Sequence, residues 1–184
     1  MTVITAKWTQ QDYHRMLEAG LLESRHVELL NGEIIEMPPE GPEHAYLGDE
    51  IGKYLSGLLG VRARVREGRP VTLPNDSEPE PDLAIVRPLG QIYRQRHPGT
   101  EDIFWLVKFS NSSLAKDLDA KRKVYAAALI QDYWVVDLKQ RQIKVFREPV
   151  EGNYRSESTF TTGEIRPLAF LDVRVSVRRL LEGL

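Results

Sequence analysis

The stretch that decides the fold is IFWLVKFS, residues 103–110. Six of its first seven residues are apolar, which is typical of a strand buried on both faces. A second apolar run, LAIV at residues 83–86, predicts another buried strand. Lys108 interrupts the first run, and a buried lysine is rare unless it is paired. If the two strands are neighbours, the Lys108 side chain reaches the end of the strand that Asp82 begins.

Helices and hairpins are predicted on both sides of these strands. Thr9 and Asp12 form a capping-box pattern for a short helix, Asn31-Gly32 is the strongest short signal for a hairpin, and Ser112 or Ser113 can cap a helix. The predicted helices are 10–19, 42–59, 114–129 and 177–183, the last capped by Ser176, and the predicted strands include 61–68, a hairpin of 132–138 with 142–148, and a polar strand pair over 153–160. This order predicts one mixed α/β domain over residues 1–184, with a central sheet covered by helices.

Composition excludes several classes of protein. The chain has 184 residues, of which 41% are hydrophobic and 28% charged, with a net charge of -2 and no cysteine. No apolar run reaches the 18 or so residues of a membrane span, and the first residues lack the pattern of a signal peptide. We therefore expect a cytoplasmic globular protein without disulfides or thiolate metal sites. Any surface that binds nucleic acid has to be local, because the chain has no overall positive charge.

A row of carboxylates leads into the strand at 83–86. Glu78, Glu80 and Asp82 alternate with prolines, so in an extended chain they share one face at intervals of roughly 6.5–7 Å. Carboxylate oxygens suit magnesium. We expect Glu78 to be a solvated surface acid, whereas Asp82 lies deepest and is the better candidate ligand.

Lys121 is a second candidate. It interrupts an otherwise apolar helical stripe that includes Leu118 and Tyr125, and Asp117 precedes it by one turn, where an acid–lysine pair is favourable. One interpretation is that Lys121 extends from the edge of the stripe to solvent. The other is that it points to the sheet and orients a water or stabilises phosphate charge.

Basic side chains offer contacts for phosphates, which position nucleic acid without reading its sequence. Alternation in VRARVREG predicts that its arginines line one face of a strand, and further basic residues stand in QIYRQRHPG and in the helix after residue 113. Each of them has an alternative interpretation as a solvated surface charge. The candidates for nucleic-acid binding are Arg62, Arg64, Arg66, Arg94, Arg96 and Lys116.

Four segments in order resemble the bacterial Uma2 (DUF820) group of endonucleases, which has the restriction-endonuclease-like fold of the PD-(D/E)xK superfamily. They are RHVELLNGEIIEMPPEGPEHAYL, SEPEPDLAIVRP, SLAKDLDAKRKVYAAALIQDYWVVDL and IKVFRE. The resemblance extends from about Thr9 to Arg147 and implies a nuclease core at about 24–148 that hydrolyses phosphodiesters with Mg²⁺ or Mn²⁺. It also implies nucleic acid, with DNA favoured over RNA, as the partner, and a homodimer as a plausible assembly.

The resemblance implies a role for each site residue. Asp82 matches a metal ligand, Glu80 a supporting position and the Phe109 carbonyl a further ligand. Lys121 matches the catalytic lysine, moved from the strand to the following helix, and Glu28 matches an acid that joins the site. His44 matches a family position, but a lone histidine is more often a capping or packing residue.

The chain departs from the family at Lys108. Relatives read roughly LVIEVSDSS where this chain has LVKFSNSS, so Lys108 stands at the position of the second metal-binding acid and Asn111 replaces an aspartate. We hypothesise that Lys108 forms an ion pair with Asp82 and replaces the charge of the metal. Two functions then remain open: a metal-dependent endonuclease, and a catalytically silent module for nucleic-acid or protein binding.

Overall fold

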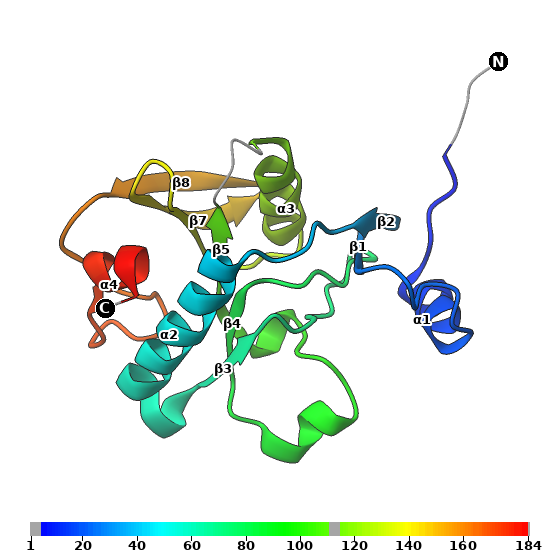
Figure 1. Cartoon of the computed structure of the whole chain (residues 1–184), viewed down its shortest axis with the longest axis horizontal. Coiled ribbons are helices and arrows are strands. Elements are labelled where there is room, and N and C mark those ends of the chain that lie inside the picture. The colour runs from blue at the N-terminus through cyan, green and yellow to red at the C-terminus, as the bar shows by residue number, and fades with distance from the viewer. Residues whose placement is uncertain (1–4, 111–114, 184) are drawn as a thin grey trace.

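This computed structural model describes residues 5–110 and 115–183, with side chains in the second range from residue 119 onward. Its centre is a six-stranded sheet with the order β3-β4-β5-β6-β7-β8 (Figure 1). The pair β5–β6 is parallel and the other neighbours are antiparallel. The strands are β3 (Arg64–Glu67), β4 (Leu83–Val86), β5 (Ile103–Ser110), β6 (Asp132–Asp137), β7 (Gln142–Val150) and β8 (Asn153–Phe160).

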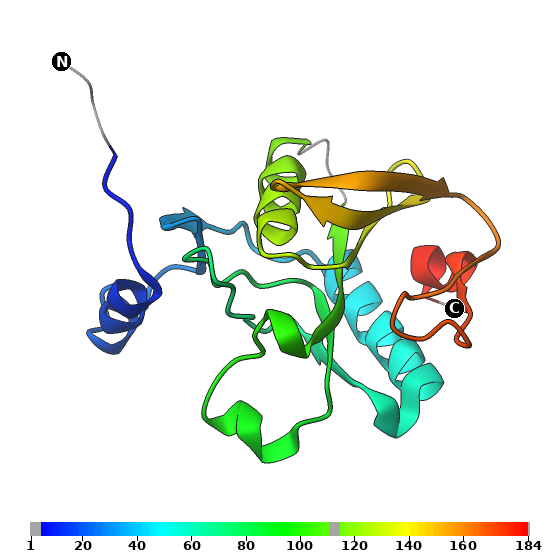
Figure 2. The ribbon, with the colours of Figure 1, turned by 180° about the vertical axis from the view of Figure 1, so that it is seen from behind.

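Helices cover this sheet on both faces, while the first helix and the first hairpin lie off to one side, as the two views show (Figures 1 and 2). The helices are α1 (Gln10–Glu18), α2 (Pro42–Leu59), α3 (Ala115–Ala127) and α4 (Val177–Glu182), and short 3-10 turns are η1 (Gly60–Arg62), η2 (Gly90–Arg94) and η3 (Thr100–Asp102). The hairpins are β1 (Val27–Leu30) with β2 (Glu33–Glu36), and β9 (Glu164–Ile165) with β10 (Val175–Ser176). The predicted mixed α/β architecture is confirmed. None of the helices in the described ranges is long and apolar enough to span a membrane.

Two apolar cores lie on opposite faces of the sheet. Trp105 and Val107 of β5 pack with α2 and α4, whereas Leu106 packs with the α3 residues Val124 and Tyr125. Side chains alternate between faces along a strand. Lys108 therefore lies on the face of Leu106, next to α3.

Local signals predicted several elements correctly. The capping box of Thr9 and Asp12 begins α1, and the Ser176 hydroxyl accepts a hydrogen bond from the Arg179 N–H at the start of α4. Asn31 and Gly32 both have positive φ values, 49° and 73°, which a type I′ hairpin turn requires. The predicted Ser112 or Ser113 cap lies outside the described residues.

Two predicted strands differ from the structure. The strand expected over 61–68 covers only β3, because α2 continues directly into η1 and holds Arg62 outside the sheet. The strand pair expected over 153–160 is instead the single strand β8, which pairs with β7 over seven positions. This pairing extends the main sheet and makes β8 its edge strand.

Candidate active site

The candidate site lies where β4 begins beside β5. Leu83 pairs with Val107, so the residues next to them, Asp82 and Lys108, lie together. The Lys108 Nζ donates to Asp82 Oδ1 at 2.5 Å. The side chains are 22% and 11% exposed, respectively. The hypothesised ion pair is therefore present in the structure.

Two further groups hold the Asp82 carboxylate. The Phe109 N–H donates to Oδ2 at 2.5 Å, and His44 Nε2 lies 3.0 Å from Oδ1. The His44 ring, at the start of α2, packs edge-on against Phe109. Burial raises the pKa of Asp82, but the hydrogen bond from His44 and the charge of Lys108 outweigh it, and the pKa is lowered. Asp82 is therefore held as a carboxylate.

A second ion pair lies deeper, between the hairpin and α3. Lys121 Nζ donates to Glu28 Oε2 at 2.8 Å, and the side chains are only 8% and 2% exposed. The backbone N–H of Glu80 donates to the same Oε2 at 3.0 Å. The interpretation that Lys121 extends to solvent is therefore wrong. The side chain of Asp117, which the sequence predicts as the partner of Lys121, lies outside the described part of the chain.

The other two carboxylates of the row point to histidines. His14 Nε2 lies 2.9 and 3.0 Å from the two oxygens of Glu78, and the Thr72 hydroxyl donates to Oε2 at 3.2 Å. Glu78 is only 4% exposed. The expectation that it is a solvated acid is wrong, because α1 brings His14 onto it. Glu80 binds His26 Nε2 at 3.0 Å.

Sequence reasoning missed His14, His26 and Thr72 as partners of this row. His14 is 64 residues from Glu78 and His26 is 54 residues from Glu80. No local pattern predicts such pairs.

A divalent metal does not fit these side chains as they stand. Lys108 occupies Asp82 Oδ1, and Glu80 binds His26. Over the described residues, no group of three or more His, Asp or Glu side chains is placed to hold a metal ion. At an effective dielectric of roughly 20, two unit charges about 4 Å apart interact by about 4 kcal/mol, so an ammonium beside a divalent cation is strongly unfavourable. The metal set of Asp82, Glu80 and the Phe109 carbonyl stays a prediction.

The basic candidates divide into two groups. Arg62, outside the sheet, donates to Asp172 at 2.7 Å, and Arg96 donates to the buried Asp102 at 2.5 Å. Arg64, Arg66 and Arg94 instead line one cavity. The side chains of Lys116 and Asn111 lie outside the described residues. Nucleic-acid binding by any of these residues stays a prediction.

Comparison with known proteins agrees with this architecture. The model of a family described as "Putative restriction endonuclease", Uma2, matches residues 10–178. A crystal structure described as "a putative nuclease belonging to DUF820" from Anabaena variabilis superposes with a TM-score of 0.66 at 16% sequence identity, covering 87% of this chain and 92% of that one. At this identity the likeness shows the fold alone. No curated protein matches the chain.

Proposed function

Because the chain belongs to the Uma2 family of restriction-endonuclease-like proteins, we propose that it binds nucleic acid on an endonuclease fold whose metal site is replaced by an ion pair. The observation that carries this proposal is the contact of 2.5 Å between Lys108 Nζ and Asp82 Oδ1. Lys108 neutralises the carboxylate that the resemblance assigns to the metal. In this proposal the fold and its surface are kept. A Mg²⁺ ion at the site would lack one anionic ligand and would be repelled by the Lys108 ammonium.

The contacts of Asp82 support this proposal. Both carboxylate oxygens accept hydrogen bonds from protein groups, Oδ1 from Lys108 and Oδ2 from the Phe109 N–H. A magnesium ion prefers oxygen ligands and near-ideal octahedral geometry, so it would have to displace Lys108 before reaching Oδ1. Breaking a fully buried ion pair typically costs about 3–5 kcal/mol, and because Lys108 is 22% exposed we expect the lower cost of about 1–2 kcal/mol for this pair. This cost weakens metal binding by the native chain.

A second candidate is a Mg²⁺- or Mn²⁺-dependent endonuclease, and one observation favours it. Lys108 is 22% exposed, so a rotation of its long side chain frees Asp82 without unpacking the sheet. Lys121 and Glu28 are retained near the site. When bound, a metal in such sites polarises the phosphate and lowers the pKa of a water.

Cleavage of supercoiled plasmid in Mg²⁺ or Mn²⁺ separates the two candidates. The native chain is compared with Lys108→Glu, which restores a carboxylate, and with Lys108→Met, which removes the cation without adding a ligand. We expect the native chain and Lys108→Met to leave the plasmid intact and Lys108→Glu to cut it. If the native chain cuts the plasmid and Asp82→Ala abolishes this cleavage, the proposal of a catalytically silent site is overturned and the endonuclease is established.

Binding is measured separately from cleavage. We expect the native chain to bind a labelled DNA, with affinity that falls as salt increases because phosphate contacts release counterions. Light scattering of the same sample tests the predicted homodimer. Absence of any binding to single- or double-stranded DNA or RNA would reject nucleic acid as the partner.

A further inference from the structure

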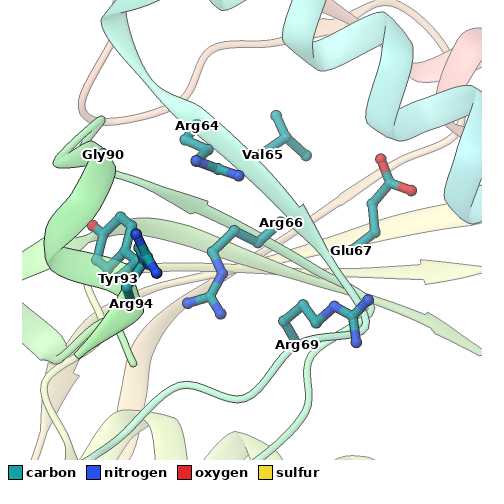
Figure 3. A pocket seen from close by; sticks show the side chains of 8 residues that line it. All are labelled: Arg64, Val65, Arg66, Glu67, Arg69, Gly90, Tyr93 and Arg94. Carbon is teal, nitrogen blue, oxygen red and sulfur yellow. The ribbon is translucent and has the colours of Figure 1, made fainter. Parts of the chain in front are cut away.

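A basic cavity lies at the edge of the sheet, between β3 and η2, and has a volume of about 350 Å³. Arg64 and Arg66 of β3, Tyr93 and Arg94 of η2, and Arg69 after the strand contribute to its lining (Figure 3). In Figure 3 the Arg94 side chain lies beside Tyr93, and the Arg66 side chain extends from β3 towards them. Three guanidinium groups thus gather at one recess.

The positive charge of this cavity is not compensated from within. Its one lining acid, Glu67, extends from the opposite side of β3 (Figure 3). The Glu67 carboxylate lies against Gly52 of α2, so close that a Cβ there would overlap it. Among the described residues, none of the four lining arginines forms a salt bridge, whereas Arg62 and Arg96 both do.

Arg66 is the centre of the site. Its guanidinium carbon lies 5.5 Å from the centre of the Tyr93 ring, an arrangement that fixes the planar group by a cation–π contact. Its Nη1 is buried and has no hydrogen-bond partner among the described residues. An unsatisfied buried donor on a charged group is costly, and the oxygens of a phosphate, like those of a carboxylate, match the donor geometry of a guanidinium.

The cavity opens on the face of the sheet that carries Asp82. Arg66 pairs with Ala84 of β4, and Ala84 is two residues from Asp82, which places these two on the same face roughly 6.5–7 Å apart. A nucleic-acid strand that passes Asp82 along this face of the sheet therefore runs beside the face of β3 from which Arg66 extends.

We propose that this cavity binds a phosphate group, supplied by the nucleic-acid strand that crosses the Asp82 site. Arg66 donates to the phosphate oxygens through its unpartnered Nη1, and Arg64 and Arg94 contribute further charge. The source of the phosphate rests on the function proposed above. The anion site itself rests on the cavity alone.

The test compares Arg66→Gln with Arg155→Gln by fluorescence anisotropy on a labelled DNA at several salt concentrations. Both substitutions remove one positive charge. Arg155 is exposed on β8, at the other edge of the sheet, so its loss does not touch the cavity. We expect Arg66→Gln to weaken binding about tenfold and to reduce the salt slope by about one. We expect Arg155→Gln to change affinity by less than about twofold. Equal effects of the two variants would overturn the proposal.

A second measurement separates this proposal from the proposed function. Inorganic phosphate is titrated into the full chain while the arginine Nε–H signals are followed by NMR. A shift of the Arg66 signal in a chain that binds no nucleic acid would support the anion site and reject the strand as its source. Absence of both responses would overturn both proposals. If Arg66→Gln does not fold, Arg94→Gln, whose side chain is exposed, takes its place.

Discussion

Replacing Lys121 by methionine leaves the Glu28 carboxylate buried without its cation. The two side chains are 8% and 2% exposed and their charged atoms are 2.8 Å apart. At an effective dielectric of roughly 20 this separation corresponds to about 6 kcal/mol of Coulomb attraction, much of it offset by desolvation. Removing one partner of such a pair costs about 3–5 kcal/mol. Since the Glu80 N–H still donates to Glu28, we expect the lower end of this range, about 3 kcal/mol.

Urea unfolding measures this loss, provided that the transition is two-state. For a chain of this size, about 3 kcal/mol corresponds to a decrease in Tm of about 6–12 °C. The double variant Glu28→Gln/Lys121→Met removes both charges, so we expect it to recover at least about 1 kcal/mol relative to Lys121→Met. The coupling comes from the full double-mutant cycle, including Glu28→Gln alone. A loss below about 1 kcal/mol for Lys121→Met, with no coupling to Glu28, would refute this assignment of a structural ion pair.

Three other predictions concern stability. Lys108→Met should cost less than Lys121→Met, about 1–2 kcal/mol, because Lys108 is more exposed and Asp82 keeps its other donors; equal losses in urea unfolding would contradict this. Burial raises the pKa of Tyr13 to about 12, so the unfolded chain loses this proton first and stability falls as pH rises from about 10 towards 12. Tyr13→Phe should reduce the loss of stability between pH 10 and 12, measured by urea unfolding. An unchanged slope in that range would be evidence against the raised pKa of Tyr13. Thr9→Ala removes the α1 cap and should cost about 1 kcal/mol, with faster hydrogen exchange in α1; unchanged exchange there would argue against the cap.

The sequence predicts best the features that depend on neighbouring residues. Capping by Thr9 and the turn at Asn31-Gly32 follow from short-range backbone geometry, and both are present. The pairing of Lys108 with Asp82 is predictable for a different reason. A lysine inside a strand buried on both faces requires an opposite charge nearby. Asp82 is the acid that directly precedes the other strand predicted to be buried.

Long-range contacts limit the prediction of the site. Lys121 and Glu28 are 93 residues apart, and only the docking of the hairpin against α3 brings them together. Glu78 carries no local sign that α1 covers it. The predicted start of the strand near Arg62 is also wrong, because Arg62 belongs to the turn η1 that follows α2, although the alternating pattern assigns it to the strand.

The Lys108–Asp82 pair also bears on how this fold depends on its surroundings. A site with two adjacent carboxylates repels itself until a divalent cation arrives, so its local order depends on the metal supply. Here the compensating charge is part of the polypeptide and is present as soon as β4 and β5 pair. Lysine and glutamate codons differ only at their first base. Under the function proposed above, a single base substitution therefore separates a strand pair whose charges are balanced within the chain from one that depends on a bound cation.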